Sequence, residues 1–332
     1  MQVNKRGEKM IITRTPFRIS FVGGGTDLKS FYQSGHGAVV STAINKYMYI
    51  SIHKYFDNKI LLKYSKTELV EKVDNIQHPL IREAMKLTGV VKGVEIASIS
   101  DIPAGTGLAS SSSFTVGLLH ALYAYRGKNV SAERLAREAA HIEINLVGSP
   151  IGKQDQYAAA FGGFNYIQFN KDESVLVHPI VFNKKKELEK NLLLFYTGIT
   201  RSANNILKEQ SKITEKNKKF EQLVKMRDLT KPLIKELEKG NIEVIGEMLH
   251  KNWLMKRSLT SSISNKEIDK LYDKALNAGA KGGKLLGAGG GGFLLFYCDL
   301  KNQDRLRKDL FDLKEVPFCF DNEGSRIIYV GE

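Results

Sequence analysis

The feature of this sequence that most constrains its fold is a glycine- and serine-rich stretch, Pro103–Ser113, between an expected strand and an expected helix. The strand is Val94–Ser100, and the residues from Phe114 to Tyr125 are apolar enough for a buried helix. Glycines let a backbone approach a ligand closely, and free N–H groups at a helix N-terminus bind anions. A flexible loop is the alternative, but the position at a strand-to-helix junction favours a phosphate site.

Two common kinds of phosphate-handling protein are excluded by missing motifs. The sequence contains no Gly-x4-Gly-Lys-Ser/Thr segment, so an ordinary P-loop is absent. It also lacks His-Arg-Asp and Asp-Phe-Gly segments, which excludes a protein-kinase fold.

Two further glycine-rich segments lie near opposite ends of the sequence. In the first, Pro16–Asp27, Thr26 and Asp27 supply short polar groups able to hold hydroxyls, although Asp27 could equally cap a turn or helix. The second, Lys284–Phe293, formally matches the Gly-x-Gly-x-x-Gly dinucleotide pattern. It leads into an expected strand instead of opening a helix, so we expect a second backbone wall against a phosphate or substrate.

Two acidic residues are candidates for chemistry. Glu143 is expected on the polar side of a helix that Ser131 caps and that runs to about Val147, and Asp155 follows a turn. Taken alone, each is better explained as a surface or capping carboxylate.

The length of 332 residues predicts two packed lobes, with a boundary in the charged, lysine-rich residues 170–190. The other strands are expected at 10–15, 46–55, 60–64, 164–169, 192–196, near 284, 293–297 and 326–330. The other helices are expected at about 154–160, 202–228, 230–239, 241–255, 265–278 and 302–313.

Composition and charge limit the partners and the cellular location that we expect for this protein. The formal charge is +14, but many lysines alternate with glutamates on expected helices and are explained as solvated faces, with attraction of anionic substrates as a second interpretation. The sequence has neither zinc-finger spacing nor a basic stripe with stacking aromatics, so it does not support a nucleic-acid partner. No apolar run approaches the ~20 residues that span a bilayer. Two cysteines and a polar, basic start predict a cytoplasmic protein with no membrane partner.

Four motifs in one order resemble the GHMP kinases, which include galactokinase, homoserine, mevalonate and phosphomevalonate kinases. The resemblance spans about residues 10–297. The motifs are Pro16-x-Arg18 with Gly23-Gly24-Gly25-Thr26-Asp27, then Pro103-x3-Gly107-Leu108-x-Ser110-Ser111, then Gly152-x2-Asp155-Gln156, then Gly287-x-Gly289-Gly290-Gly291-Gly292. The first motif resembles most closely that of the D-glycero-D-manno-heptose 7-phosphate kinases.

The resemblance implies an α+β, two-lobed GHMP kinase fold. Its N-terminal lobe, 10–180, would be ribosomal protein S5 domain 2-like with a four- or five-stranded mixed sheet. Its C-terminal lobe, 190–332, would be ferredoxin-like, with the active site between the two.

The resemblance also implies roles for individual residues. Asp155 would be the catalytic aspartate beside the accepting hydroxyl, Arg18 would pair with it, and Ser111 and Glu143 would bind Mg²⁺. The ATP phosphates would lie along Pro103, Gly105, Thr106, Gly107, Leu108, Ala109, Ser110, Ser111 and Ser112. The sugar would contact Gly24, Gly25, Thr26, Asp27, Gly289 and Gly290. Apart from the resemblance, the phosphate of the sugar needs donors, for which Arg201 is the first candidate and Lys153 the second, although each is equally well explained as a surface charge.

The implied activity is phosphorylation of the anomeric C1 hydroxyl of D-glycero-D-manno-heptose 7-phosphate to the 1,7-bisphosphate, for synthesis of nucleotide-activated heptose. Galactokinases have Gly-Glu-His where this chain has Gly23-Gly24-Gly25, so galactose is disfavoured and a larger or phosphorylated sugar is allowed. Alternatives are a fucokinase-like or other sugar 1-kinase, a catalytically silent sugar or nucleotide sensor, and, more distantly, a nucleic-acid-binding protein. The sequence leaves the oligomeric state open, with a homodimer as one option.

Overall fold

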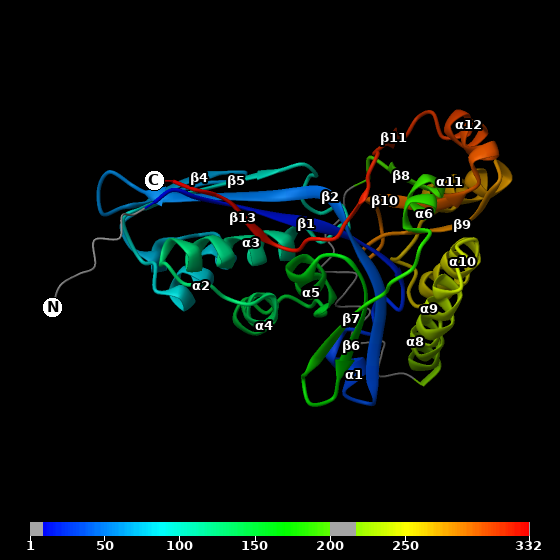
Figure 1. Cartoon of the computed structure of the whole chain (residues 1–332), viewed down its shortest axis with the longest axis horizontal. Coiled ribbons are helices and arrows are strands. Elements are labelled where there is room, and N and C mark those ends of the chain that lie inside the picture. Colours follow the sequence, from blue (N-terminus) through cyan, green and yellow to red (C-terminus); the bar gives the residue numbers. More distant parts are fainter. Residues whose placement is uncertain (1–8, 200–216, 332) are drawn as a thin grey trace.

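The computed structural model describes residues 9–199 and 217–331, and their strands form two sheets (Figure 1). The first sheet is ordered β13-β1-β2-β5-β3-β4, with β12 and β6 also paired to β2 and β7 paired to β6. Its strands are β1 (Ile11–Val22), β2 (His36–Lys54), β3 (Ile60–Lys63), β4 (Thr67–Val70), β5 (Val94–Ser100), β6 (Phe164–Asn170), β7 (Val175–Pro179), β12 (Phe320–Asp321) and β13 (Arg326–Val330).

The antiparallel pair β1 and β2 forms the long axis of this sheet. The expected short strand at 10–15 is part of one continuous strand, with Pro16 at an irregularity in the register. β2 begins at His36, well before the expected residue 46. Its first half is buried almost continuously, so it lacks the alternation that indicates a strand.

Helices cover one face of the first sheet (Figure 1). The buried helix α3 packs on β1 and β2, as its apolar sequence predicts. The helices on this side are α2 (Pro79–Thr88), α3 (Ser110–Tyr125), α4 (Ala132–Ala140) and α5 (Gln154–Phe161), and the 3₁₀ turn Val73–Asn75 and the π-helical turn His141–Leu146 contact them. The short helix α1 (Lys29–Tyr32) contacts β2, and its Phe31 belongs to the core cluster that includes residues of the second sheet. The sequence analysis did not anticipate α2.

The helix expected from Ser131 to about Val147 is divided into two parts. The Ser131 side chain accepts a hydrogen bond from the backbone N–H of Arg134, which confirms the expected N-cap. At His141 the α-helical pattern gives way to the π-helical turn. Such turns are rare and often occur at functional sites, and this one carries Glu143.

The second sheet is ordered β11-β8-β10-β9, and all its pairings are antiparallel. Its strands are β8 (Leu192–Tyr196), β9 (Ala280–Leu285), β10 (Phe293–Cys298) and β11 (Lys314–Glu315). The helices of this part are α6 (Lys185–Asn191), α8 (Asn217–Asp228), α9 (Thr230–Glu238), α10 (Val244–Arg257), α11 (Lys266–Asn277) and α12 (Leu300–Asp309). The helix expected at 302–313 therefore starts and ends earlier, and residues 200–216 of the helix expected at 202–228 lie outside the described residues.

Helix α10 joins the two parts of the molecule because it contacts both β9 and β1. The side-chain oxygen of its Asn252 accepts a hydrogen bond from the backbone N–H of Gly23, just after β1. This helix therefore fixes the glycine turn at 23–25 relative to the second sheet.

Two short strands from residues 320–330 belong to the first sheet, because β12 pairs with β2 and β13 pairs with β1. With these and the edge strands, the first sheet has nine strands among the described residues, more than the four or five expected. The mixed α and β architecture agrees with the predicted fold class. The division into lobes at 10–180 and 190–332 stays a prediction.

Candidate active site

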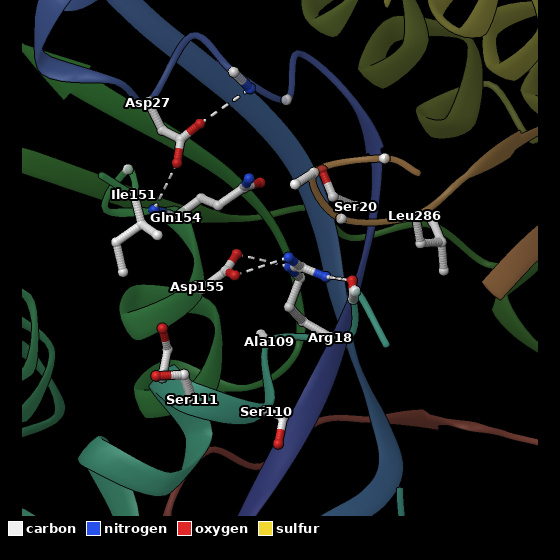
Figure 2. A pocket seen from close by; sticks show the side chains of 18 of the residues that line it. Arg18, Ser20, Asp27, Ala109, Ser110, Ser111, Ile151, Gln154, Asp155 and Leu286 are labelled. Atoms are coloured by element: carbon white, nitrogen blue, oxygen red, sulfur yellow. Dashed lines mark hydrogen bonds and ion pairs between the residues drawn. The ribbon is translucent and has the colours of Figure 1, made fainter. Parts of the chain in front are cut away.

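A pocket of about 270 Å³ lies where β1, the start of α3, the start of α5, α10 and the turn after β9 meet (Figure 2). Most of the residues proposed from the motifs line it. They include Arg18, Gly24, Gly25, Asp27, Gly105, Gly107, Ala109, Ser110, Ser111, Ser112, Asp155 and Gly289. The structure thus brings together segments that are far apart in the sequence.

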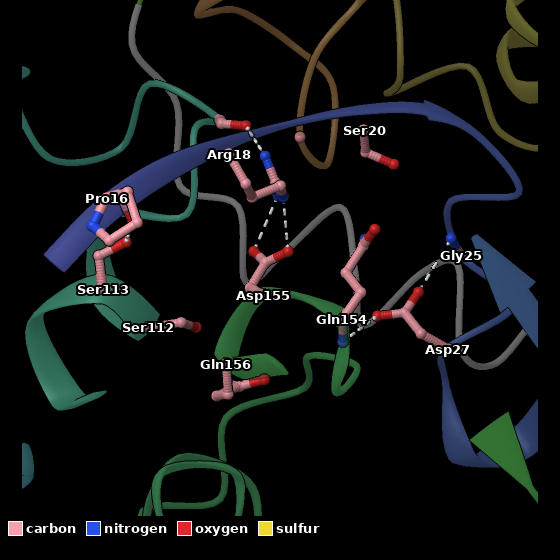
Figure 3. A network of polar contacts seen from close by, with 12 residues as sticks. Pro16, Arg18, Ser20, Gly25, Asp27, Ser112, Ser113, Gln154, Asp155 and Gln156 are labelled. Atoms are coloured by element: carbon pink, nitrogen blue, oxygen red, sulfur yellow. Dashed lines mark hydrogen bonds and ion pairs between the residues drawn. The ribbon is translucent and has the colours of Figure 1, made fainter. Parts of the chain in front are cut away.

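Arg18 and Asp155 form a two-armed ion pair at the centre of the pocket (Figures 2 and 3). The Nε and Nη2 groups of Arg18 each donate to one oxygen of Asp155, at 2.8 Å. The third arm, Nη1, donates to the carbonyl of Gly107 at 2.8 Å. The Arg18 side chain is 3% exposed and that of Asp155 is 24% exposed, so the aspartate is open to a ligand while its partner is fixed.

Asp27 lies beside this pair and is buried. Its two oxygens accept hydrogen bonds from the backbone N–H groups of Gly25, at 3.0 Å, and Gln154, at 3.2 Å (Figure 3). Burial, and then the nearby charge of Asp155, raise the pKa of Asp27 to about 6. Gly152 adjoins it closely, since a Cβ on Gly152 would lie 1.9 Å from an Asp27 oxygen.

Glu143 is buried, which corrects its expected place on the polar side of a helix. Its carboxylate accepts hydrogen bonds from Ser111, at 2.5 Å, from Ser112, at 2.8 Å, and from the Gln156 amide. Burial raises the pKa of Glu143 despite these three donors. The sequence did not reveal that Glu143 is buried. A glutamate on a helix with otherwise apolar residues is normally assigned to the solvent-facing side, and the donors that allow its burial cannot be identified from the sequence.

Ser111 and Glu143 offer the hard oxygen ligands that magnesium prefers. Ser111 lines the pocket, whereas Glu143 is buried and does not line it, but contacts Ser111 and Ser112, which do. Within residues 9–199 and 217–331, no cluster of three or more His, Cys, Asp or Glu side chains is suited to hold a metal by itself. Magnesium commonly uses one or two protein oxygens, with phosphate and water completing its shell. The pair is consistent with such a shared site.

The loop at 103–113 delivers backbone N–H groups to the pocket at the start of α3. Ala109 precedes this helix in a left-handed conformation, with φ of 73°. The carbonyl of Leu108 accepts a hydrogen bond from the backbone N–H of Arg18, at 3.2 Å. An anion-binding helix N-terminus therefore faces the ion pair of Arg18 and Asp155.

Several predicted residues do not line this pocket. Pro103 is exposed and Thr106 and Leu108 are buried within the loop, and the Thr106 hydroxyl donates to the Pro103 carbonyl. Thr26 is fully buried and its hydroxyl bonds to Gly23 and Ala38.

Gly290 donates its N–H to Ile263. Lys153 lines a second pocket, which shares Asp27 and Ile151 with the first. Arg201 lies outside the described residues.

Sequence reasoning missed two buried lysines in the pocket wall, Lys256 and Lys284. Lys256 donates to the Gly287 carbonyl, and burial together with the Arg18 charge lowers its pKa to about 8. Lys284 donates to the carbonyls of Ser20 and Phe21 at 2.9 and 3.0 Å. A lone lysine in the apolar, glycine-rich segment 282–295 was a signal for Lys284, whereas Lys256 stands in a Lys-Arg pair that is typical of a helix surface.

Comparison with known proteins identifies the family of this chain. The GHMP kinases N terminal domain matches residues 69–163, and the GHMP kinases C terminal domain matches residues 233–313. The chain belongs to the GHMP kinase family and is a phosphotransferase with an alcohol group as acceptor. ATP as phosphoryl donor is consistent with that membership.

Individual relatives cover nearly the whole chain. The chain is 30% identical to the D-glycero-alpha-D-manno-heptose 7-phosphate kinase of Campylobacter jejuni, over 96% of this chain and 98% of the relative. It is 29% identical to a galactokinase of Pyrococcus furiosus, over 87% and 89%.

Solved structures show the same fold. A D-glycero-D-manno-heptose 1-phosphate kinase from Bacteroides thetaiotaomicron superimposes with a TM-score of 0.80 at 23% identity, over 97% of this chain and 100% of that one. A putative sugar kinase from C. jejuni gives a TM-score of 0.74 at 27% identity, over 97% and 99%. Among the described residues, no helix combines the length and apolarity needed to span a membrane.

Proposed function

We propose that this protein transfers the γ-phosphoryl group of ATP to the anomeric C1 hydroxyl of D-glycero-D-manno-heptose 7-phosphate, giving the 1,7-bisphosphate. The observation that carries the proposal is the partly open carboxylate of Asp155, held by two arms of Arg18 and facing the glycine-rich loop. The sugar is suggested by the name of the 30% identical relative from C. jejuni and by the first motif.

In phosphoryl transfer the protein contributes chiefly by positioning the reacting groups and by stabilising charge. Asp155 orients the anomeric hydroxyl and accepts its proton, while Arg18 fixes the carboxylate and adds positive charge beside the transferring group. The backbone N–H groups at the start of α3 hold the ATP phosphates. Magnesium held by Ser111 and Glu143 would supply further positive charge against those phosphates.

The wall opposite Asp155 has room for a sugar because residues 24 and 25 are glycines. A Cβ on Gly24 would meet only the Ser20 hydroxyl, at 3.7 Å, so this wall is open. Asp27 keeps unused lone pairs on both oxygens and can accept hydrogen bonds from sugar hydroxyls. The two free cysteines, Cys298 and Cys319, fit work in a reducing cytoplasm.

A substrate panel tests the proposal. ATP turnover with Mg²⁺ is measured against D-glycero-D-manno-heptose 7-phosphate, mannose, fucose and galactose, and ³¹P NMR locates the new phosphate. We expect fast turnover only with the heptose 7-phosphate and a new anomeric phosphate signal. Turnover only on an unphosphorylated sugar would reassign the substrate, and ATP binding without any turnover would favour the sensor alternative.

A further inference from the structure

A second pocket of about 490 Å³ opens beside the first and shares Asp27 and Ile151 with it. Its walls carry basic side chains from several elements. These are Lys29 from α1, Arg137 from α4, His141 from the π-helical turn and Lys153 from the residue before α5. Its acidic residues are Asp27, Glu138 and Glu173. Glu138 is paired with Arg134 at 2.8 Å, and Asp27 accepts from the backbone N–H groups of Gly25 and Gln154, so Glu173 is the carboxylate that pairs with these cations.

Glu173 is the point at which three donors converge. Lys153 donates to its carboxylate, the Tyr32 hydroxyl donates at 2.8 Å, and Lys29 lies 3.1 Å away. Lys153 also lies over the Tyr32 ring, 5.1 Å from its centroid. Donors from three separate elements around one carboxylate form the geometry of an oxyanion site.

The backbone of Glu173 is itself unusual. It lies in the turn between β6 and β7 with φ of 70°, a left-handed conformation that is uncommon for residues other than glycine. Its side chain is 42% exposed. Although burial acts in the opposite direction, hydrogen bonds from Lys153, Tyr32 and Lys29 lower the pKa of Glu173 to about 2. The side chain is therefore a fixed anion that has room to leave toward solvent.

The sequence connects this anion site directly to the catalytic residue. Lys153 lies in the second pocket and Asp155 in the first, and the N–H of Gln154 between them donates to Asp27. The two pockets adjoin, because they share Asp27 and Ile151 and because the α-carbons of Lys153 and Asp155, two residues apart, are separated by at most about 7 Å. A ligand that places one end against Asp155 and passes Asp27 brings its other end to Lys153.

We propose that the second pocket binds the terminal phosphate monoester of the sugar substrate, with Lys153, Lys29 and Tyr32 donating to its oxygens. Glu173 holds these donors in the free protein and is displaced when the phosphate binds. This inference rests on the proposed function, since it requires a substrate with a phosphate at the end opposite the accepting hydroxyl.

The exchange is favoured by charge. A phosphate monoester carries about −1.5 to −2 charges at pH 7 and three acceptor oxygens, whereas a carboxylate carries one charge and two oxygens. An unphosphorylated sugar offers no group to replace Glu173, so the cations stay paired with it. The pocket therefore selects phosphorylated sugars by displacing an internal anion of lower charge.

The proposal predicts opposite changes in substrate affinity for two substitutions in the second pocket. Lys153→Met removes a charge-assisted donor, and the Kd for D-glycero-D-manno-heptose 7-phosphate should rise roughly tenfold to a hundredfold. Glu173→Gln removes the competing anion, and the same Kd should fall. Neither change should alter the Kd for the unphosphorylated heptose, and Lys171→Met, on the exposed part of the same turn, serves as the matched control.

Titration calorimetry without ATP measures these constants independently of turnover. Equal Kd values for Lys153→Met and Lys171→Met, or weaker binding in Glu173→Gln, would overturn the proposal. If heptose 7-phosphate is not turned over but inorganic phosphate binds in a Lys153-dependent manner, the pocket stands and the proposed substrate fails. If the heptose 7-phosphate is turned over but none of these variants changes its Kd, the substrate stands and the pocket assignment fails.

Discussion

Gly107 and Gly287 pack backbone against backbone, so closely that a Cβ on Gly287 would lie 2.4 Å from the α-carbon of Gly107. Both have left-handed φ angles, of 86° and 72°. The carbonyl of Gly107 also accepts from Arg18, and that of Gly287 accepts from Lys256. This contact holds the glycine-rich loop before α3 against the turn after β9 and so sets the shape of the pocket.

Substituting Gly107 should therefore cost more than its backbone angle alone predicts. A Cβ at Gly107 would lie 2.6 Å from the carbonyl oxygen of Leu286, whereas a Cβ at Gly105, with φ of 77°, meets nothing within 4 Å. Gly105→Ala should cost about 1–2 kcal/mol for the left-handed angle. Gly107→Ala should cost about 1–3 kcal/mol more from overpacking, and it should also raise the KM for ATP.

Urea unfolding of both variants measures this difference, and Gly105→Ala is the control because it shares the loop and the sign of φ. Equal free energies of unfolding for the two would show that the two loops can separate without cost.

Asp155→Asn tests whether the carboxylate takes the proton. If it acts as the base, kcat should fall roughly 10²–10⁴-fold, because the amide cannot accept the proton. The KM for ATP should change little, since the site that we propose for the phosphates is the loop before α3. A kcat within tenfold of wild type would leave Asp155 with orientation only.

Glu143→Gln should raise the Mg²⁺ concentration that gives half-maximal velocity. The amide is close in shape but lacks the charge, and changes of this kind around a metal commonly cost about 10-fold to 100-fold in affinity. Glu133→Gln, on the exposed side of α4, is the control. An unchanged Mg²⁺ dependence in Glu143→Gln would place the ion elsewhere.

The raised pKa of Asp27 predicts a pH-dependent stability difference. The folded state holds this proton more tightly than the unfolded state, whose ordinary pKa is 3.8, so the Asp27 contribution to stability falls as pH rises toward 6. Relative to Asp27→Asn, the wild type should lose about 2 kcal/mol of unfolding free energy between pH 4.5 and pH 7.

Chemical denaturation at the two pH values measures this loss. Asp304→Asn, at a fully exposed side chain, should show no such difference from the wild type. A constant difference between Asp27→Asn and the wild type at both pH values would mean that Asp27 titrates normally.

The elements around the pocket were predictable where the local sequence pattern is strong. Val94–Ser100 and Arg326–Val330 have the expected bounds, and α3 starts four residues before the expected Phe114, within the serine run. The first half of β2 was missed, because a strand buried on both faces does not alternate. The local pattern therefore located the glycine-rich loop before α3 but not the full sheet beneath it.

The contacts within the candidate site were harder to predict from the sequence. The pairing of Arg18 with Asp155 follows from the family resemblance, since no spacing in the sequence joins residues 137 positions apart. Glu143 was misplaced because its three donors come from α3 and α5, which only the fold brings near it. The role of Glu173 as a counterion depends on a turn conformation that its sequence, Lys171-Asp172-Glu173-Ser174, does not specify.

The pairing of β13 with β1 has a consequence for how the protein is made. β1 leaves the ribosome well before β13, so one of its edges finds its partner only when residues 326–330 have been synthesised. Until then that edge presents unpaired N–H and C=O groups that could join strands of other chains. A nascent chain stalled before residue 326 would therefore expose an open edge on the strand that carries Arg18.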